Sequence, residues 1–347
     1  MKRKVLSWIF GAAASAFAAA AATAGTLDDV KTAGVLKCGV TQSGTLGFSS
    51  PDANNNWSGM DVDYCKAVAA AIFNDATKVK YIPLSAKERF TALQSGEIDI
   101  LSRTTTWTMS RDTSLGLKFA GVMYYDGQGM MVRKSLGVDS ALKLDGATVC
   151  TTTGTTTELN LADYFKANNM KYQVVAMENA DEVLKAYEEG RCDIFTTDQS
   201  GLYGERLKLA NPDDHIVLPE IISKEPLGPL VRQGDDAWFN VSKWTYYALL
   251  TAEEFGITQA NVEEMAKTAT NPEIQRILGV KNADGSAAGF GTGIGVSEDW
   301  IVNIVKAVGN YGEIFERNVG PNTPLKIARG KNALWSQGGL QYAPPIR

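Results

Sequence analysis

The sequence has 347 residues, of which 44% are hydrophobic and 21% charged, and its formal net charge at pH 7 is −5. A mildly acidic chain is poorly suited to nucleic acid or to an anionic membrane surface, so we expect neither as a partner. A chain of this length exceeds one ordinary hydrophobic core, which predicts two lobes or domains.

The N-terminus has the pattern of a secretory signal peptide. A basic head, 1–4, precedes an alanine-rich apolar run, 5–22, and Ala22-Thr23-Ala24 fits a small-x-small cleavage site. Cleavage after Ala24 removes three basic residues and no acidic one, so the net charge becomes −8. No later apolar run reaches the roughly 18 residues of a membrane span, and we expect the mature protein to be soluble in the periplasm.

Export changes the interpretation of the four cysteines. In an oxidising compartment an even number of cysteines favours disulfides. Three pairings are possible. We favour Cys38–Cys65 with Cys150–Cys192, because pairing within each lobe leaves the lobes free to move.

The sequence offers almost no material for a metal site or a histidine-based catalytic triad. It has no CxxC motif and a single histidine, His215, in a polar segment that we expect to be a surface loop. We therefore predict no metal, no cofactor and no catalytic residue.

The first lobe begins with alternating strands and helices. We predict strands at 36–41 and 78–82 and helices at 65–74 and 87–94. This β-α-β-α-β order predicts a mainly parallel sheet with helices on both faces. Asp61 and Asp63 precede the first of these helices, where acids satisfy free amides, so we expect a structural role for both.

The next predicted strand, 97–101, leads into a polar loop. Ser102, Arg103 and the threonines at 104–106 follow it, and Arg111 comes shortly after. In open α/β sheets, ligands bind at the carboxyl ends of the strands. Arg111 can hold a carboxylate with two parallel hydrogen bonds, and the threonines add hydroxyl and backbone donors. A solvated loop is the alternative.

A second copy of this helix–strand–loop unit lies at 180–204. When 95–101 is aligned with 189–195, Thr104 falls opposite Asp198. One loop then offers a cation and hydroxyls, and the other offers a carboxylate. Two such lobes are suited to holding a zwitterion between them, and chance similarity of two amphipathic units is the alternative.

The second lobe opens with a short strand and a threonine-rich turn. Thr155 and Glu158 have the spacing of a capping box, and Gly154 allows close approach to the backbone. Free amides at a helix start favour an anion. Thr156 is therefore a candidate for a second contact with the carboxylate that Arg111 holds, and a plain surface segment is the alternative.

The rest of the chain predicts further strands at 172–176 and 216–218, a return crossover at 219–229, and helices at 236–255, 274–280 and 300–308. We expect these helices and the tail after them to form an extension that packs on the first lobe. The glycine-rich segment 283–295 is expected as a loop near the cleft or hinge.

Four motifs, GMDVDYCKAVAA, SGEIDILSRTTTWTMSR, GTTTE and GRCDIFTTD, resemble the polar amino-acid-binding proteins of periplasmic ABC importers. Their order and spacing are similar over essentially all of the mature chain, which with its tail resembles the general L-amino acid-binding members. The resemblance implies an α/β, two-lobed periplasmic binding protein fold (type II). Each lobe is then a mixed, mainly parallel sheet flanked by helices, with two hinge crossovers. The expected parts are a signal peptide at 1–24, a first lobe with the C-terminal extension at 25–125 and 227–347, and a second lobe at 126–226.

The resemblance also implies the ligand contacts. It assigns the ligand's α-carboxylate to Arg111, Thr106 and Thr156, and its α-ammonium to Thr104 and Asp198. Candidates for the side-chain pocket are Thr41, Arg103 and Thr197.

The chain departs from many relatives where two aromatic residues enclose the ligand side chain. It has Gly44 or Thr45 at one of these places and Ser85 or Ala86 at the other, which favours broad specificity. Arg103 stands where relatives often have serine. It selects acidic ligands if it faces the cleft, but we expect it to point outward into solvent.

The implied function is capture of L-amino acids and their delivery to a membrane ABC permease by a monomer without enzymatic activity. One alternative is a binding protein specific for acidic amino acids, glutamate or aspartate. Another is an exported enzyme on the same scaffold that resembles cyclohexadienyl dehydratase, with Asp198 or Glu158 as its general acid.

Overall fold

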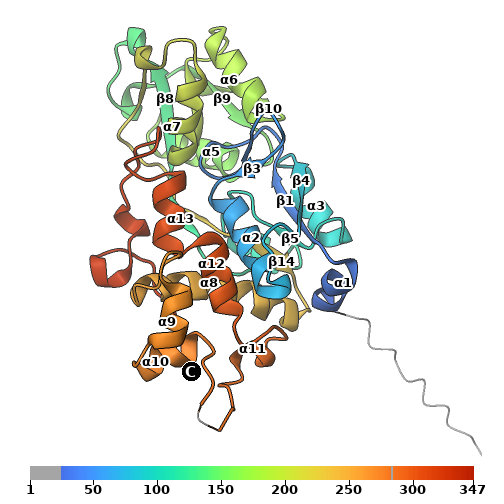
Figure 1. Cartoon of the computed structure of the whole chain (residues 1–347). Helices are drawn as coiled ribbons and strands as arrows, with labels where there is room; N and C mark the ends of the chain where they lie inside the picture. Colours follow the sequence, from blue (N-terminus) through green and yellow to red (C-terminus); the bar gives the residue numbers. More distant parts are fainter. Residues whose placement is uncertain (1–24, 283) are drawn as a thin grey trace, which may run out of the picture.

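The computed structural model describes residues 25–282 and 284–347, so the expected signal peptide at 1–24 lies outside the described residues. The described chain forms two lobes, each built on a five-stranded sheet, and Figure 1 shows them one above the other. None of the described helices is long and apolar enough to cross a membrane.

The sheet of the first lobe is mixed. Its strands in spatial order are β4 (Val79–Leu84), β1 (Leu36–Thr41), β5 (Ile100–Leu101), β14 (Leu230–Arg232) and β6 (Leu117–Phe119). β1 runs parallel to β4 and β5, whereas β14 runs antiparallel to β5 and β6. The chain therefore returns to this sheet through β14 after it has built the second lobe.

The sheet of the second lobe repeats this arrangement. Its strands in spatial order are β10 (Tyr172–Met177), β9 (Ala147–Thr152), β11 (Ile194–Asp198), β8 (Gln128–Arg133) and β12 (His215–Val217). β9 runs parallel to β10 and β11, and β8 runs antiparallel to β11 and β12. The two aligned sequence segments, 95–101 and 189–195, thus lead into equivalent strands, β5 and β11. The expectation of a surface loop at His215 is wrong, because His215 begins β12 and its Nδ1 lies 2.8 Å from the Tyr187 hydroxyl.

Two short strands connect the lobes. β7 (Tyr124–Asp126) pairs antiparallel with β13 (Glu225–Leu227), β7 continues into β8, and β13 continues into β14. The lobe boundaries expected at 125/126 and 226/227 fall within these two strands. A small hairpin of β2 (Ser50–Pro51) and β3 (Trp57–Ser58) lies in the first lobe.

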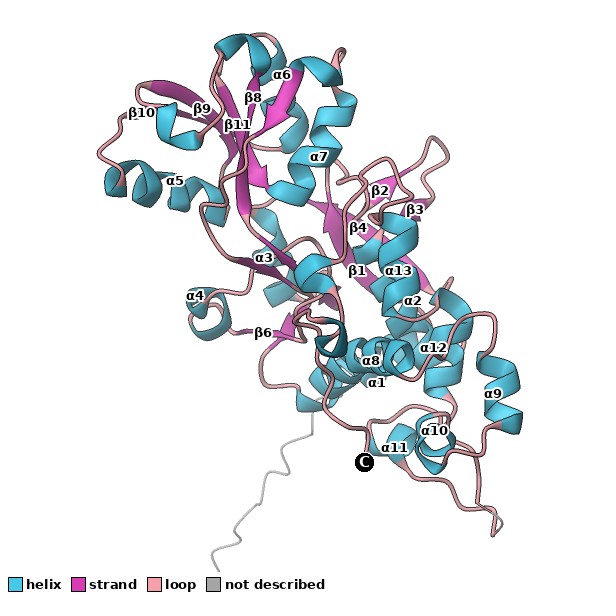
Figure 2. Ribbon diagram, turned by 90° about the vertical axis from the view of Figure 1, so that its left-hand side faces the viewer, coloured by secondary structure: helices cyan, strands magenta, loops and turns pink. Residues whose placement is uncertain are grey.

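Helices cover both sheets. The first lobe has α1 (Thr26–Ala33), α2 (Met60–Phe73), α3 (Glu88–Ser95), α4 (Met109–Thr113) and α8 (Asp236–Glu254). The second has α5 (Thr156–Ala167), α6 (Ala180–Glu188) and α7 (Gln199–Lys208). The remaining helices are α9 (Val262–Thr268), α10 (Pro272–Ile277), α11 (Phe290–Gly293), α12 (Trp300–Val308) and α13 (Tyr311–Asn318), with 3₁₀ turns at Lys134–Leu136, Ala141–Lys143, Pro212–Asp214, Gly330–Asn332 and Trp335–Gln337. In Figure 2, α5 to α7 surround the second sheet, α8 to α12 lie toward the opposite end of the molecule, and α13 lies between them beside α2.

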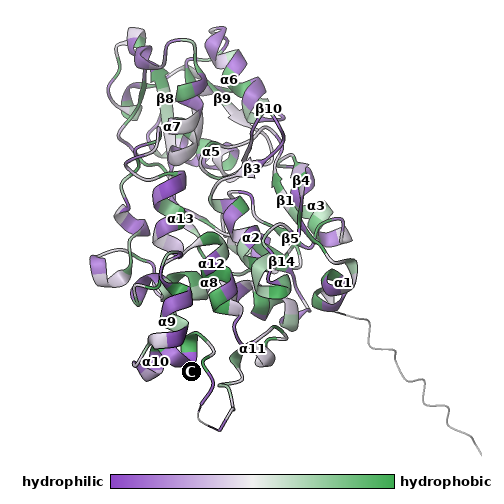
Figure 3. Ribbon diagram, viewed as in Figure 1, coloured by the Kyte–Doolittle hydropathy of each residue, from purple (hydrophilic) through white to green (hydrophobic). Residues whose placement is uncertain are grey.

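Apolar clusters lie on both faces of each sheet, so the hydrophobic core of each lobe lies between the sheet and the helices that cover it. In the first lobe, Leu36 and Val40 of β1 share one cluster with Ile304 of α12, while Leu84 and Leu101 belong to a cluster on the other face. Figure 3 shows apolar colour along β1 and β14 and on α8 and α12. The C-terminal helices therefore complete the first lobe's core, as expected for a packed extension.

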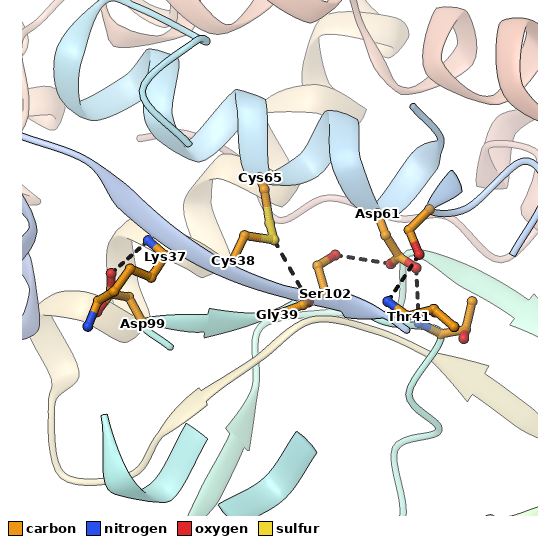
Figure 4. Close-up of a disulfide and its surroundings, with 10 residues drawn as sticks. Lys37, Cys38, Gly39, Thr41, Asp61, Cys65, Asp99 and Ser102 are labelled. Atoms are coloured by element: carbon orange, nitrogen blue, oxygen red, sulfur yellow. Dashed lines mark hydrogen bonds and ion pairs between the residues drawn. A yellow bond between two sulfur atoms is a disulfide. The ribbon is translucent and has the colours of Figure 1, made fainter. Parts of the chain in front are cut away.

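Both cysteine pairs favoured from the sequence are joined in the structure. Cys38 of β1 bonds Cys65 of α2, and Cys150 of β9 bonds Cys192, which precedes β11. Figure 4 shows the first disulfide between the strand and the helix that covers it. Each bridge therefore links elements of one lobe.

The glycine-rich segment is not near the cleft, so that expectation is wrong. It includes α11, which lies at the end of the molecule away from the second lobe (Figure 1). A pocket there is bordered by Phe290 and Ile294 of this segment, by Trp244 of α8 and by Ile346 near the C-terminus. Phe290 and Ile294 also pack against the apolar cluster of the first lobe, which holds the segment at this end of the molecule.

Candidate functional site

A cavity of about 80 Å³ lies between the two lobes. Loops after β1, β4 and β5 line it from the first lobe, and loops after β9, β10 and β11 line it from the second. The lining residues are Thr41, Gln42, Ser43, Thr45, Ser85, Ala86, Arg89, Arg103, Thr104, Thr106, Thr152, Thr155, Thr156, Thr157, Asn179, Ala180, Thr197 and Asp198. Most of these follow the carboxyl end of a strand, the position at which open α/β sheets bind ligands.

Thr104 forms part of the first-lobe wall in an unusual backbone conformation. Its φ of 36° lies in the left-handed region, which is uncommon for a β-branched residue. The Asp61 carboxylate accepts hydrogen bonds from the Thr104 amide at 3.0 Å and from the Ser102 hydroxyl at 3.0 Å. Figure 4 shows Asp61 reaching from the start of α2 to Ser102. Asp61 therefore shapes the site loop in addition to its place in the first turn of the helix.

The pKa of Asp61 reflects competing influences. Burial raises this pKa to about 6, while the hydrogen bonds from Thr104 and Ser102 and the charge of Arg103 act to lower it. The Asp61 side chain supports the loop as the acceptor of these two hydrogen bonds.

Asp198 faces Thr104 across the cavity, at the junction of β11 and α7. Its side chain makes no capping hydrogen bond to the described helix α7. Asp126 performs that role, because it accepts hydrogen bonds from the Ser200 amide at 3.3 Å and the Ser200 hydroxyl at 2.5 Å. Burial raises the pKa of Asp198 well above its usual range, and the charges of Asp126 and Glu225 raise it further. A bound cation would stabilise the ionised carboxylate in these surroundings.

Arg103 and Arg89 are buried arginines in the cavity wall. Arg103 donates from Nε to the Leu84 carbonyl oxygen at 3.0 Å, so the expectation that it points outward into solvent is wrong. Arg89 of α3 donates from Nη1 to the Thr105 hydroxyl at 3.3 Å, and its buried Nε has no hydrogen-bond partner among the described residues. Burial lowers the pKa of both, that of Arg103 to about 10. Arg103 is therefore a cation at neutral pH.

Arg111 lies one layer behind the cavity wall. It is buried, its Nη1 donates to the Thr106 carbonyl oxygen at 2.9 Å, and its guanidinium carbon lies 5.1 Å from the centre of the Phe90 ring. It is not among the residues that line the cavity. A contact between Arg111 and a ligand carboxylate therefore depends on N–H groups other than the one engaged with Thr106.

Glu225 of the hinge strand β13 connects hydroxyls of both lobes. Its Oε2 accepts hydrogen bonds from Thr106 at 2.5 Å and from Thr156 at 2.9 Å, and these two hydroxyl oxygens lie 3.3 Å apart. Its Oε1 accepts hydrogen bonds from Ser223 and Asn160. The two hydroxyls that the sequence assigns to a ligand carboxylate thus point toward a protein carboxylate in this structure.

The start of α5 contributes the second-lobe wall beside Glu225. The Thr155 hydroxyl accepts a hydrogen bond from the Glu158 amide at 3.2 Å. The Glu158 carboxylate accepts one from the Gly154 amide at 2.9 Å, one residue before the position that a capping box would use. The expected cap is present in this modified form, and Thr156, the first residue of the helix, lines the cavity.

The small residues at the positions of the missing aromatics also line the cavity. Thr45, Ser85 and Ala86 are in its wall, whereas Gly44 is not. Thr41 and Thr197, expected in the side-chain pocket, line it as well. The wall is therefore made of short polar side chains between buried charges, without an aromatic clamp.

Sequence reasoning missed Arg89 and Glu225. A signal for Arg89 was present, because helical spacing places it on the same face as the apolar Ala92 and Leu93, and all three are buried. Glu225 had no such signal, since its role depends on a crossover strand that brings it beside hydroxyls more than sixty residues away in the chain.

Two α/β lobes joined by two paired strands, with a polar cavity between their strand ends, define a two-lobed binding protein. The chain belongs to the bacterial extracellular solute-binding proteins, family 3, whose model matches residues 36–241. Its fold is the type II periplasmic binding protein fold expected from the sequence.

Relatives extend this similarity over the whole chain. The chain is 64% identical over 347 residues, 100% of both proteins, to the general L-amino acid-binding periplasmic protein AapJ of Rhizobium johnstonii. It is 55% identical over 342 residues, 98% of the chain and 99% of the relative, to the glutamate/glutamine/aspartate/asparagine-binding protein BztA of Rhodobacter capsulatus. A solved structure of an ABC transporter / periplasmic binding protein from Brucella ovis with glutathione bound superposes with a TM-score of 0.90 at 62% identity, covering 94% of this chain and 100% of that one.

Proposed function

We propose that this protein binds an L-amino acid in the cavity between its lobes and delivers it to an ABC permease. The observation that carries the proposal is that Asp198 of one lobe faces the hydroxyls and buried arginines of the other in one cavity. An amino acid carries one positive and one negative group, and the cavity offers a partner for each. The names of AapJ and BztA, two amino-acid-binding relatives, support this ligand class.

We infer the ligand contacts from this arrangement and from the family resemblance. Arg111 and the amides at the start of α5, with Thr106 and Thr156, hold the α-carboxylate. Asp198 and Thr104 hold the α-ammonium. Thr41, Arg103 and Thr197 surround the side chain.

The hydroxyls of Thr106 and Thr156 each carry one proton, and Glu225 accepts both. A ligand carboxylate can accept hydrogen bonds from these hydroxyls only if the hydroxyls rotate away from Glu225. In the orientation seen here, its donors are the Arg111 guanidinium and the helix-start amides.

Binding closes the lobes in this proposal. Either lobe alone reaches one end of the amino acid, so the ligand has higher affinity for the closed state than for the open one and shifts the population toward closure. We propose β7 and β13 as the hinge, so that 25–125 with 227–347 moves against 126–226.

Broad specificity follows from the composition of the wall. Thr45, Ser85 and Ala86 leave the side chain without an aromatic clamp, and short polar residues tolerate side chains of different size. The name of AapJ, a general L-amino acid-binding relative, supports this breadth.

A second candidate function, preference for acidic amino acids, is favoured by Arg89 and Arg103. Both guanidinium groups are buried in the cavity wall, and the Arg89 Nε has no hydrogen-bond partner among the described residues. A side-chain carboxylate would supply one. The name of BztA, whose ligands include glutamate and aspartate, supports this reading.

We further propose that the protein is exported to the periplasm with cleavage after Ala24, acts there as a monomer, and binds its ligand without converting it. The enzyme alternative, a cyclohexadienyl-dehydratase-like activity, would use Asp198 as general acid, because that carboxyl has a raised pKa in the cavity. An enzyme would convert the ligand into a product, whereas a binding protein would release it unchanged.

Titration calorimetry of residues 25–347 against the common amino acids tests the proposal. We expect one ligand per chain with micromolar or tighter affinity, about −8 kcal/mol or beyond, and NMR spectra that show the ligand unchanged after release. Asp198→Asn and Arg111→Met should each weaken all amino acids alike, Asp198→Asn by about 3–5 kcal/mol, because both residues contact only the groups common to all amino acids.

Glu189→Gln serves as the control, since this exposed carboxylate lies on the second lobe away from the cavity. A wild-type protein that binds no amino acid, or a site variant that changes selectivity and leaves affinity intact, would contradict the proposal. Formation of a new product would favour the enzyme.

A further inference from the structure

A second cavity of about 60 Å³ adjoins the one between the lobes. The two cavities share the lining residues Thr45, Thr104, Ala180, Thr197 and Asp198. They therefore meet at the residues inferred for the ligand ammonium. Each is larger than the roughly 10–15 Å³ that one water molecule needs.

The second cavity continues along α7 from Asp198 to Glu205, past Ser200 and Gly201. Asp198 and Glu205 are two helical turns apart, which places them on the same face and roughly 10 Å from each other along the axis. Gly201 lies between them on this face. A Cβ atom at Gly201 would have one heavy atom within 4 Å, Thr197 Cγ2 at 3.4 Å, so the space above the glycine is open.

Glu205 lines this second cavity and has one carboxylate oxygen without a partner among the described residues. The residue is only 3% exposed. Its Oε1 accepts a hydrogen bond from Lys208 Nζ at 3.0 Å, whereas its buried Oε2 has no hydrogen-bond partner among the described residues. A buried carboxylate oxygen without a donor costs free energy, and a donor on a ligand would remove that cost.

We propose that the second cavity receives the cationic end of a basic amino acid, whose side-chain ammonium or guanidinium group donates a hydrogen bond to Glu205 Oε2. This inference rests on the proposed function, because it requires the α-ammonium at Asp198, where the two cavities meet. It gives the site two ends of opposite charge. Acidic side chains bind toward Arg89 and Arg103, and basic side chains bind toward Glu205.

This arrangement gives broad specificity a physical basis beyond the absence of aromatic clamps. A buried site with one sign of charge would reject side chains of that same sign, because burying like charges together is costly. Here each sign has its own compartment, and a small neutral side chain needs neither.

The chemistry that Glu205 recognises is a protonated nitrogen. In a basic amino acid this is the side-chain nitrogen, in addition to the α-ammonium at Asp198, whereas in a short peptide it is the single terminal amine. The test therefore compares L-lysine, L-glutamine and alanyl-alanine. Calorimetry of residues 25–347 is carried out with the wild type, Glu205→Gln and the control Glu189→Gln, with thermal unfolding to verify that each variant is folded.

Glu205→Gln should weaken lysine binding roughly tenfold or more, since a charged hydrogen bond is lost, and should change glutamine binding less than about threefold. Gly201→Leu provides a second route, because its side chain fills the cavity without altering a charge. It should abolish lysine binding. L-alanine, measured with this variant as a further ligand, should still bind, because its side chain is too short to reach the second cavity. Glu189→Gln should bind all three compounds as the wild type does.

Lysine affinity that is unchanged in Glu205→Gln, or a wild type that binds glutamine but not lysine, would overturn this inference and leave the proposed function intact. Dependence of alanyl-alanine alone on Glu205 would also overturn it, and would assign the cavity to peptides. A wild type that binds no amino acid would remove the proposed function together with the inference.

Discussion

Thr104 has a left-handed backbone beside the cavity, and Asp61 accepts a hydrogen bond from its amide. We predict that Asp61→Ala weakens ligand binding by about 1–3 kcal/mol, since the strained residue relaxes when its acceptor is removed. Asp61→Asn should recover most of this loss, because its amide oxygen can accept from Thr104 while its NH₂ group donates to the Ser102 hydroxyl. Calorimetry measures both variants.

Recovery by asparagine distinguishes a positioning role from a requirement for the charge. If Asp61→Asn and Asp61→Ala weaken binding equally, the charge interaction between Asp61 and Arg103 is what matters. If neither variant changes affinity, the Thr104 backbone does not depend on Asp61.

A second residue-scale prediction concerns pH. The pKa of Asp198 in the unliganded protein is raised, first by burial and then by Asp126 and Glu225, and the pKa of Asp126 itself is raised to about 6 by burial. A ligand ammonium pairs with the ionised form of Asp198. Below the raised pKa, binding must therefore expel a proton, and affinity should fall by up to about tenfold for each pH unit.

Calorimetry from pH 8 to pH 5, in buffers with different ionisation enthalpies, measures both the affinity and the number of protons released. We expect weaker binding and proton release as the pH is lowered. Affinity that is constant or rises on acidification would show that the ligand ammonium does not bind an ionised carboxylate at this site.

The sequence allowed some site residues to be predicted and not others, for a physical reason. Thr104 and Asp198 were found because they follow equivalent strands in two similar segments, and such a repeat is visible along the chain. Arg103 was expected in solvent because its burial depends on the Leu84 carbonyl of a neighbouring strand. Contacts of this kind arise only when the sheet has assembled.

At the scale of elements, segments with a strong pattern of their own could be predicted from the sequence, whereas segments that depend on distant partners could not. The strand at 36–41 and the helix at 300–308 match β1 and α12 residue for residue, because their apolar patterns are strong and continuous. The short strands β6, β7, β13 and β14 were not predicted, and neither was the six-residue strand β8. Two or three residues carry little pattern of their own, and their partners are far away in the chain.

Each disulfide links two elements of one lobe covalently, and this gives a prediction about stability. The Cys150–Cys192 bridge spans a sequence separation of 42 residues. Loop-closure entropy suggests that it stabilises the protein by about 3–4 kcal/mol. The double variant Cys150→Ala with Cys192→Ala should therefore unfold at a clearly lower temperature than the wild type, as measured by calorimetry or circular dichroism.

Below its unfolding temperature, the same variant should bind ligand with nearly unchanged affinity, because neither cysteine lines the cavity. Chemical reduction of the wild type should lower its unfolding temperature further, since the Cys38–Cys65 bridge is then also lost. An unfolding temperature equal to that of the wild type would show that packing alone holds β9 and β11 together.

At the scale of the whole molecule, the C-terminal extension does more than complete the first lobe. Leu325 of the extension and Leu46 of the first lobe both approach Gly204 of α7 in the second lobe. A Cβ atom at Gly204 would lie 3.2 Å from Leu46 Cβ and 3.8 Å from Leu325 Cδ2. Tyr203 beside it packs against the same apolar cluster that contains Leu325. The extension therefore adds to the contact between the lobes in the arrangement described here.

A substitution at this contact should oppose closure of the lobes without altering the ligand site. In Gly204→Leu, a large side chain would enter a space that has no room for it, and overpacking of this kind costs about 1–3 kcal/mol. The cost falls on the closed arrangement, because opening the lobes separates Gly204 from Leu46 and Leu325. Affinity for every amino acid should fall by a similar factor, since the wedge does not touch the ligand.

Calorimetry with several amino acids measures this effect, and small-angle X-ray scattering with saturating ligand shows whether the variant stays more open than the wild type. Leu207→Ala on the exposed face of α7 is the control, and should bind normally. A wild-type affinity in Gly204→Leu would mean that the contact between the extension and α7 is absent from the ligand-bound state. Loss of affinity for some amino acids only would mean instead that α7 acts through the side-chain cavity that Gly201 and Glu205 line.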